Sequence, residues 1–321
     1  MSAMSADSSY FEVPALSASG MKDLMVSPLR FWYRHVNPDR VEDPPSAEMR
    51  FGTALHCAVL QPNEFDHRYA RAMVVPEGTL DTMADIRQWI SDKGQKPKGT
   101  VKADIIAQAR SIDPTVQVLD LLKSDYGKAN VGKEILSDDD YTRIEGAFNA
   151  LMEEPKVVDI LREGESEVPL FVNDPEYGVP LKCKMDWKAP KFIMDLKTFQ
   201  TKRDKPIDEA VTDAIWYEGY HRQAYMYSWI RSLVEGTPLR SSEFVFVFIE
   251  SWPPHEVRIR KMRPTVAGQP SLLWEKARQD VNRCVRLYAE HLKHFGDKPW
   301  RYAQEGTQIA DEEVRPLAFA Y

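Results

Sequence analysis

The sequence predicts an α/β protein with a central mixed β-sheet flanked by helices and a helical N-terminal part. Short segments rich in β-branched and aromatic residues gather in the second half of the chain, which is typical of strands. Segments with helical periodicity precede, separate and follow them. In addition, 43% of the 321 residues are hydrophobic, so the chain can build a sizeable core. Because no internal repeat or clear linker is evident, we expect a single domain over residues 1–321.

The first part of the chain is expected to be helical. Ser17 or Ser19 can cap a helix whose buried stripe includes Leu24 and Met25. The elements expected here are a flexible start over 1–13, a helix within 16–36 that is interrupted at Ser27-Pro28, a loop over 38–46, and an apolar helix over 49–62 that ends at Gln61-Pro62.

The middle of the chain, residues 76–135, gives the weakest pattern and is interpreted as an insertion of unclear role. Its polar segment 92–102 is rich in Gly and Lys, which predicts a mobile loop. The flanking segments 82–91 and 103–123 are expected to be helices. Residues 138–155 then predict an amphipathic helix with acidic residues at its N-terminus.

The second half of the chain supplies the sheet. Strands are expected at 167–174, 179–187, 191–199, 242–251 and 255–262, with helices over 207–234 and 270–295 and an irregular tail over 299–321. A tight Lys188-Ala189-Pro190 connection joins the second and third strands, which predicts a hairpin.

Composition excludes several classes of protein. No apolar run approaches the roughly 20 residues that span a bilayer, and the N-terminus lacks the basic and apolar regions of a signal peptide. The three cysteines, Cys57, Cys183 and Cys284, are far apart and odd in number. They suit a reducing cytoplasm and exclude a disulfide framework or a four-cysteine metal site within one chain. No Walker A motif is present, so built-in ATP use is not expected.

Charge gives a mixed indication about nucleic acid. The formal net charge is −7, which argues weakly against such a partner. Residues 181–205, however, hold eight Lys and Arg against three Asp. A local basic strip in an acidic protein is the pattern expected if DNA meets one face only, with DNA binding that depends strongly on salt.

The main chemical signal is Asp186 followed by Asp195 and Lys197. Side chains alternate along a strand, so Asp195 and Lys197 share a face, and the preceding strand can place Asp186 beside them. Two close carboxylates repel, which raises one pKa, and a divalent cation relieves the repulsion. Mg²⁺ prefers oxygen ligands and keeps several waters, one of which can attack a phosphate while Lys197 positions or deprotonates it. The alternative is a solvated strand edge with a surface ion pair, and a turn-initiating role for Asp186.

Six segments, in this order, resemble a known family: LSASGMKDLMVSPLRFWY, MRFGTALHCAVLQP, the strand with Glu167, CKMDW, FIMDLKT and YHRQAYMYSW. Together they resemble the PD-(D/E)xK nuclease superfamily, and within it the RecE-like (exonuclease VIII) phage-type exonucleases, with lambda exonuclease more distant. The resemblance covers about 16–260 apart from 76–135. It implies a restriction-endonuclease-like core.

The resemblance also implies site residues. They are the metal ligands His56, Asp186, Asp195 and the backbone carbonyl of Leu196, the catalytic Lys197, and the supporting Gln223 and Tyr227. Gln223 and Tyr227 are spaced i, i+4 and so share a helix face. Each has an ordinary alternative: His56 as a satisfied core histidine, and Gln223 and Tyr227 as core-edge residues. Glu167 could assist the metal or the water, or be a solvated strand-edge residue.

Contacts to DNA would come from polar and basic residues that hold the backbone without reading sequence. The candidates are Ser17, Ser19, Arg30, Arg34, Arg50, Thr198, Lys202 and Arg203. Arginine suits bidentate capture of phosphate, including a terminal 5′-phosphate. Each of these residues could instead be an ordinary solvated side chain.

The resemblance implies a Mg²⁺-dependent, ATP-independent, processive 5′→3′ exonuclease for double-stranded DNA ends, in which Mn²⁺ can replace Mg²⁺. It further implies a cytoplasmic, bacterial or phage-encoded ring-like homo-oligomer, a trimer in preference to a tetramer, with a single-strand annealing protein as partner. One alternative is a helicase- or CRISPR-linked nuclease of the same superfamily. Such relatives commonly hold an iron–sulfur cluster on four cysteines, which three scattered cysteines argue against. Another alternative is a non-catalytic DNA-binding phage protein.

Overall fold

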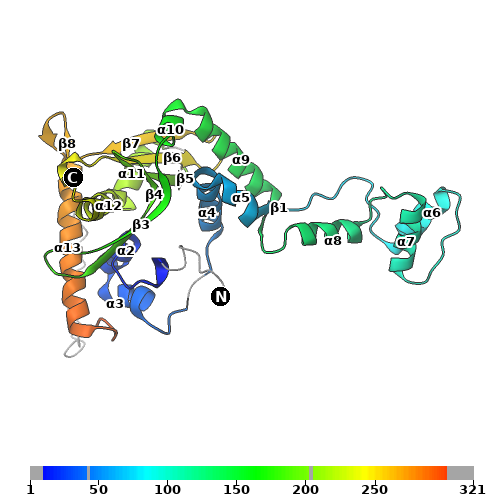
Figure 1. Ribbon diagram of the computed structural model, residues 1–321, viewed down its shortest axis with the longest axis horizontal. Coiled ribbons are helices and arrows are strands. Elements are labelled where there is room, and N and C mark those ends of the chain that lie inside the picture. The colour runs from blue at the N-terminus through cyan, green and yellow to red at the C-terminus, as the bar shows by residue number, and fades with distance from the viewer. Residues whose placement is uncertain (1–9, 42–43, 202–204, 302–321) are drawn as a thin grey trace.

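A five-stranded mixed β-sheet forms the centre of the molecule (Figure 1). The computed structural model describes residues 10–41, 44–201 and 205–301. In spatial order the strands are β3 (Glu165–Asn173), β4 (Pro180–Lys188), β5 (Ile193–Phe199), β6 (Phe244–Glu250) and β7 (Val257–Met262). The predicted fold class and all five predicted strands are therefore confirmed, with ends that differ by two residues at most.

Strand pairing explains why the sheet is mixed. β5 and β6 run parallel, whereas β3–β4, β4–β5 and β6–β7 are antiparallel. β4 and β5 pair only next to their connection, at Trp187↔Met194 and Lys188↔Ile193. Beyond that point the two strands separate, and this opening contains the predicted catalytic residues.

Both faces of the sheet are covered by helices because β6 is apolar on both sides. Its residues alternate between Phe244, Phe246 and Phe248, which belong to one core cluster, and Val245, Val247 and Ile249, which belong to another. The first cluster is completed by α2 (Ala18–Val26), α12 (Tyr220–Glu235) and α13 (Leu272–Phe295), and the second by α4 (Ala47–Leu60) and α9 (Asp138–Glu153).

Shorter elements connect these layers. They are α3 (Pro28–Phe31), the π-helical turn η1 (Trp32–Val36), α5 (Pro62–Arg68), α10 (Pro155–Ile160), α11 (Ile207–Tyr217), the 3₁₀ turn η2 (Leu239–Ser241), and the paired β8 (Thr265–Val266) and β9 (Gln269–Pro270). Ser17 caps α2 by accepting a hydrogen bond from the Gly20 amide at 3.1 Å, as predicted. Ser27 ends α2 and caps α3, with Pro28 in its first turn.

Two predicted helices are wrong because each is broken into two. Residues 207–234 form α11 and α12, separated at Gly219, whose φ of 76° is left-handed and suits glycine. Residues 103–123 form α7 (Lys102–Ile112) and the start of α8 (Leu119–Ala129), separated around Pro114. Proline removes an amide donor and clashes with the preceding helical turn.

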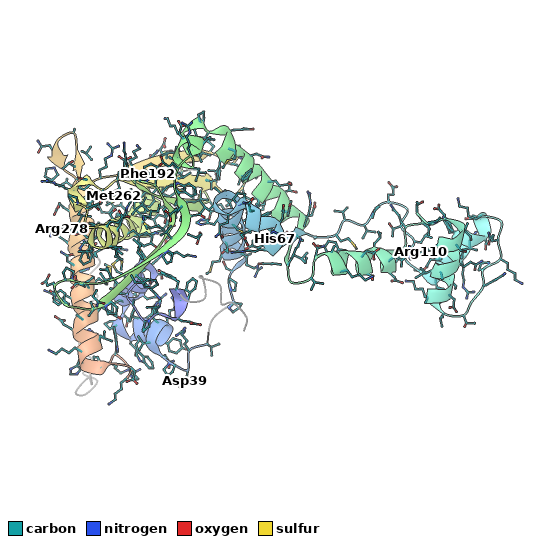
Figure 2. The ribbon with its side chains drawn as sticks, viewed as in Figure 1. Asp39, His67, Arg110, Phe192, Met262 and Arg278 are labelled. Carbon is teal, nitrogen blue, oxygen red and sulfur yellow. The ribbon has the colours of Figure 1, made fainter. Side chains whose placement is uncertain are left out.

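The predicted insertion forms an arm, which we define as residues 72–133 (Figure 1). At its root β1 (Tyr69–Arg71) and β2 (Glu134–Leu136) pair in parallel. Its α6 (Met83–Asp92) and α7 pack on a small core of their own, made by Ile86, Ile90, Ile105, Ala109 and Val118. Figure 2 shows Arg110 far out on the arm and His67 near its root.

Candidate metal and active site

At the opening between β4 and β5, a hydrogen bond from a backbone amide to a side chain replaces the backbone–backbone hydrogen bonds of a paired sheet. Asp186 Oδ2 accepts a hydrogen bond from the backbone amide of Leu196 at 2.9 Å. That amide would otherwise point into the gap, where an unpaired buried N–H costs about 1–3 kcal/mol. The sequence thus places a carboxylate where the two strands part, and the predicted juxtaposition of Asp186 with the Asp195–Lys197 strand is present.

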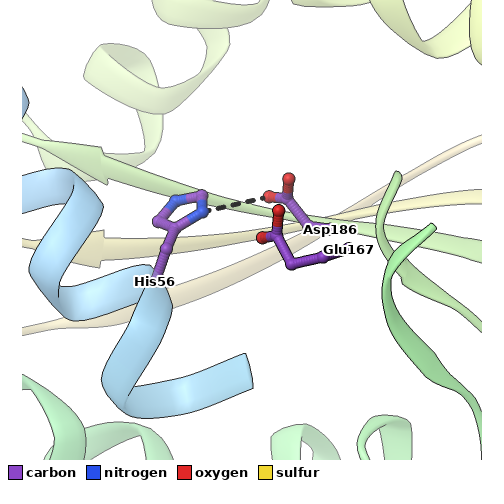
Figure 3. Close-up of side chains that lie close together, drawn as sticks. All are labelled: His56, Glu167 and Asp186. Atoms are coloured by element: carbon purple, nitrogen blue, oxygen red, sulfur yellow. Dashed lines mark ion pairs between the residues drawn. The ribbon is translucent and has the colours of Figure 1, made fainter. Parts of the chain in front are cut away.

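Three potential metal ligands converge at this opening (Figure 3). They are His56 from α4, Glu167 from β3 and Asp186 from β4, whose ligand atoms all lie within 4.8 Å of one another. His56 Nδ1 lies 3.5 Å from Asp186 Oδ2. The set combines an imidazole with oxygen ligands, which suits Mn²⁺ fully and Mg²⁺ through its carboxylates.

Glu167 adopts an unusual backbone conformation that presents its carboxylate. Its φ is 56°, in the left-handed region, which is uncommon for a residue with a side chain. The flanking residues Ser166 and Val168 still pair in register with Trp187 and Met185, so Glu167 lies opposite Asp186. Lys184 Nζ lies 2.6 Å from the Glu167 carboxylate. Strained backbone of this kind is concentrated at functional sites, and alternating burial alone could not have predicted it.

Asp195 and Lys197 lie on the face of β5 that meets α12. Lys197 Nζ is 2.7 Å from Asp195 Oδ2, and Gln223 Nε2 donates to Asp195 Oδ1 at 2.6 Å. Asp195 is only 1% exposed. Its Oδ2 nevertheless has no hydrogen bond of good geometry among the described residues. This oxygen is, however, in an ion pair with the Lys197 ammonium, so a metal bound at Asp195 would share the carboxylate with that lysine. The fit to a divalent metal rests on the imidazole and carboxylate ligand atoms of His56, Glu167 and Asp186.

Tyr220 is a neighbour of the lysine that the sequence analysis missed. Lys197 Nζ lies 4.7 Å from the centroid of the Tyr220 ring, within cation–π range. The ring is itself packed at a tilt against Phe246 and Phe248. The sequence could have indicated this contact, because Tyr220 lies three residues before Gln223 and the two side chains therefore share a helix face. Tyr227 lies deeper, with its ring 6.3 Å from that of Phe244.

The electrostatics of the site reflect crowded negative charge. Burial, followed by the charge of Asp195, raises the pKa of Asp186 from 3.8 to about 6. Burial also disfavours the charged form of Lys197, but the Asp195 and Asp186 carboxylates outweigh it and hold the pKa of that lysine above its usual value. Within the described residues, three carboxylates here face two ammonium groups, those of Lys184 and Lys197.

The predicted DNA-contacting residues fall into separate places. Ser17 and Ser19 lie at the start of α2, with their hydroxyls 3.0 Å apart. Arg30 and Arg34 each donate to Asp23 Oδ1 at 2.9 Å, and His35 lies 2.9 Å from Asp23 Oδ2. The two guanidinium side chains remain 45% and 48% exposed, so they can still meet a phosphate.

The remaining candidates lie closer to α4 or outside the described residues. Arg50 Nη1 donates to the Pro45 carbonyl at 3.1 Å. Thr198 directly follows Lys197 and faces α4 at Gly52, where an added Cβ would lie 3.6 Å from the Thr198 hydroxyl. Lys202 and Arg203 lie outside the described residues.

Within residues 181–201 and 205, the described part of the basic segment, most lysines are paired and do not form the continuous cationic surface that the composition predicted. Lys182 is 8% exposed, and its ammonium donates to the carbonyls of Tyr10 and Val13 at 2.9 and 2.7 Å. Other lysines of the segment pair with carboxylates: Lys184 with Glu167, Lys188 with Glu235, Lys197 with Asp195 and Lys205 with Asp213. Their charges are therefore largely compensated inside the molecule.

Comparisons with known proteins agree with this fold. A crystal structure of a "putative exonuclease" from Eubacterium rectale is similar, with a TM-score of 0.51 at 16% identity. The similarity covers 89% of this chain and 86% of that chain, and at this identity it shows the fold alone. A crystal structure of SSO0001 matches with a TM-score of 0.26 at 13% identity, over 74% of this chain and 85% of that chain. This similarity is too low to indicate a shared fold. Comparison with curated proteins gave no match.

The remaining findings concern membrane-spanning helices and the protein family. Across the part of the chain that the structure describes, no helix combines the length and apolarity needed to cross a membrane. The family model described as a PDDEXK-like domain of unknown function (DUF3799) matches residues 17–291, which is most of the chain. The chain therefore belongs to the family of PDDEXK-like domains.

Proposed function

We propose that this protein is a Mg²⁺-dependent, ATP-independent exonuclease that degrades linear double-stranded DNA processively from 5′ to 3′. The product would be a 3′ single strand for an annealing protein. One observation carries the proposal: His56, Glu167 and Asp186 bring three potential ligand atoms together at the opening where β4 and β5 part, and the Asp195–Lys197 ion pair lies on β5. Family membership supports nuclease chemistry at such a site.

The metal-binding role is assigned to residues from four elements. His56, Asp186 and Asp195 would hold the ion together with the Leu196 carbonyl, and Glu167 would contribute directly or through water. Bound there, Mg²⁺ would supply a water of lowered pKa and offset negative charge that develops on the phosphate. Gln223 donates to one oxygen of Asp195 and Lys197 contacts the other, which fixes the orientation of the carboxylate that the ion would share with the lysine.

Lys197 would act on the phosphate. Its ammonium is held between the Asp195 carboxylate and the face of the Tyr220 ring, and its side chain is 18% exposed. A cation fixed in advance at this place stabilises charge that appears in the transition state without having to reorganise. The same position allows Lys197 to orient the attacking water through hydrogen bonds.

The DNA backbone would be held by residues that flank the opening. Arg30 and Arg34 present half-exposed guanidinium groups, and Thr198 follows the catalytic lysine on β5. Processive digestion further requires that the enzyme stay on its substrate, for which a closed homo-oligomeric ring, a trimer in preference to a tetramer, is the simplest arrangement.

Digestion of linear duplex DNA with one labelled 5′ end tests the proposal. We expect label release with Mg²⁺ or Mn²⁺, no release with EDTA, no effect of ATP, and faster digestion of 5′-phosphorylated than of 5′-hydroxyl ends. Light scattering measured in parallel should give a trimer or tetramer. No cleavage of any DNA with either metal would overturn the proposed activity, and a monomer with and without DNA would overturn the ring.

A further inference from the structure

A cavity lies at the carboxyl ends of β5 and β6, and neither the proposed metal ligands nor Lys197 line it. Its volume is about 310 Å³, and it is lined by residues that include Phe51, Asp140, Arg143, Thr198 and Trp252. It is formed where the parallel strands β5 and β6 end, together with the start of α4. In open α/β sheets, ligands bind at the carboxyl ends of strands.

The cavity lies at the end of β5 on the face where Thr198 meets α4 at Gly52, which is the face opposite to the Lys197 side chain. Thr198, which lines it, is the next residue after Lys197 and the third after Asp195. Three residues of strand span about 10 Å. Adjacent nucleotides of a duplex rise about 3.4 Å, and more when a strand is extended. Gly52, which faces Thr198, lies one turn of α4 from the metal ligand proposed above, His56, a rise of about 6 Å. A nucleotide that neighbours a phosphate bound at the metal can therefore reach this cavity.

One wall of the cavity is a rigid stack that ends in an exposed indole. The Arg143 guanidinium carbon lies 4.4 Å from the centroid of the Phe51 ring and 3.7 Å from that of the Trp252 ring. Arg143 also donates to the carbonyl of Ser251 at 3.1 Å and to Asp140 at 3.0 Å, so the loop that carries Trp252 is fixed to α9. Trp252 nevertheless remains 42% exposed.

The charges around the cavity indicate which part of a nucleotide would enter. Glu48 and Asp140 both line it, and the charge of Arg143 is used by Asp140 and the two aromatic rings. Two carboxylates disfavour a phosphate but can accept hydrogen bonds from the amino groups of a base. An indole face with carboxylate acceptors nearby is therefore complementary to an uncharged nucleobase.

We propose that this cavity binds an unpaired nucleobase of the DNA next to the scissile phosphate, stacked on Trp252. The inference rests on the proposed nuclease function and extends it from the phosphate to the base. Stacking on an aromatic side chain is tolerant of base identity, since every base has a π-face. The site would therefore help to separate the terminal base pair without imposing sequence preference.

The test combines two enzyme variants with two substrates. Binding of a 5′-phosphorylated duplex is measured by fluorescence anisotropy with Ca²⁺ in place of Mg²⁺, and KM for cleavage is measured with Mg²⁺. The second substrate carries an abasic residue in place of the terminal base. Trp252→Ala should raise Kd and KM about tenfold or more on the normal duplex, consistent with stacking, and Trp252→Phe should recover most of the loss.

On the abasic duplex, wild type and Trp252→Ala should agree within about twofold, because the contact that the variant removes is already absent. Tyr177→Ala is the matched control, since Tyr177 is 39% exposed and lies in the turn before β4, at the other end of that strand from Asp186. It should resemble wild type on both substrates.

Three outcomes would overturn the inference. Wild-type values for Trp252→Ala on both duplexes would overturn this inference alone and leave the proposed nuclease function standing. An equal loss on both duplexes would show that Trp252 acts structurally. Failure of the wild type to bind or cut either duplex would overturn both proposals.

Discussion

Two clusters of charged side chains in this molecule have opposite balances. Around Asp23, one carboxylate accepts contacts from Arg30, Arg34 and His35, each at 2.9 Å. At the opening between β4 and β5, the Glu167 and Asp186 carboxylates lie close to His56, with Asp195 on the next strand, and the ammonium groups are those of Lys184 and Lys197. In the first cluster, three basic side chains contact one carboxylate. In the second cluster, carboxylates outnumber the ammonium groups that pair with them.

The pKa values of the two clusters move accordingly. Burial alone would raise the pKa of Asp23, but the hydrogen bond from His35 and the charge of Arg34 outweigh it and lower the pKa. Burial and the neighbouring Asp195 raise the pKa of Asp186 to about 6. The difference is that the partners of Asp23 favour its ionised form, whereas those of Asp186 do not outweigh burial and the charge of Asp195, which is the imbalance that the proposed metal would relieve.

The largest expected effect is on catalysis. Lys197→Ala should lower the cleavage rate by at least about 10²–10³-fold, because the lost charge acts on the transition state. Metal binding should persist, since the removed cation competes with the metal. Asp195→Ala should lose metal binding and cleavage together. Turnover on linear duplex and Mn²⁺ calorimetry measure both variants, and wild-type digestion by Lys197→Ala would refute the catalytic assignment.

Metal binding should stabilise the protein next most strongly. A ligand present at 100 times its Kd adds about 2.7 kcal/mol of stability, so Mn²⁺ should raise the melting temperature of the wild type measurably. His56→Ala and Asp186→Asn should shrink this rise. Asp23→Asn, which alters the complete cluster, should show the full rise. A wild-type melting curve that does not respond to saturating Mn²⁺ or Mg²⁺ would contradict the metal site.

Without metal, the two carboxylates should respond to neutralisation with opposite signs. The raised pKa of Asp186 means that its ionisation costs stability, a cost that is absent below about pH 4 and grows as pH rises through about 6. Asp186→Asn should therefore stabilise the metal-free protein at pH 7 by about 1–3 kcal/mol. Its amide oxygen can still accept from the Leu196 amide.

Asp23→Asn should destabilise instead. The lowered pKa of Asp23 means that its ionised form stabilises the fold above about pH 4, and that this contribution is lost as the pH falls through the lowered value. The loss should be about 1 kcal/mol, because the two arginines are half-exposed and screened. Urea denaturation at pH 7 measures the free energy of unfolding of both variants. A change of the same sign in Asp186→Asn and Asp23→Asn would contradict the proposed difference between the two clusters.

The smallest expected effect concerns Tyr220. Tyr220→Leu removes the aromatic face beneath the Lys197 ammonium. It should lower kcat about two- to tenfold, in line with cation–π energies of about 0.5–1 kcal/mol or somewhat more. Tyr220→Phe keeps the ring and should retain most of the activity. Equal losses in the two variants would assign the effect to the hydroxyl group and not to the ring.

The sequence predicted best those structural elements that depend on residues only a few positions apart. The Ser17 cap, the helix end before Pro62 and the five strands were predictable, because capping residues and alternation act within a few positions. The break at Pro114 was available from the same rules, but helical periodicity on both sides was given more weight. Gly219 is compatible with a helix interior, so only its left-handed conformation reveals that break.

The candidate site was predictable in its residue types and less so in its partners. Asp186, Asp195 and Lys197 could be placed together from strand alternation and motif order. Glu167 was predicted only as a residue that could assist the metal or the water, with a solvated strand-edge residue as the alternative, because its orientation depends on a backbone conformation that alternation does not predict. The lysines of 181–205 looked like one surface in the sequence. In the fold, carboxylates of other elements pair with some of them, such as Glu167 of β3 with Lys184 and Glu235 of α12 with Lys188.

The parallel pair β1–β2 at the root of the arm has a consequence for how this chain can be remodelled. The pair fixes where the chain leaves and rejoins the body, and Arg71 and Glu145 add an ion pair at the same place. Because the arm has its own small core, residues 72–133 can in principle be exchanged as a unit. A replacement needs only to span the three-residue length of the strands, roughly 10 Å. The strand pair at the root is thus a suitable boundary for exchanging the arm. We expect that a different segment can replace residues 72–133 while the sheet and the proposed site keep their structure.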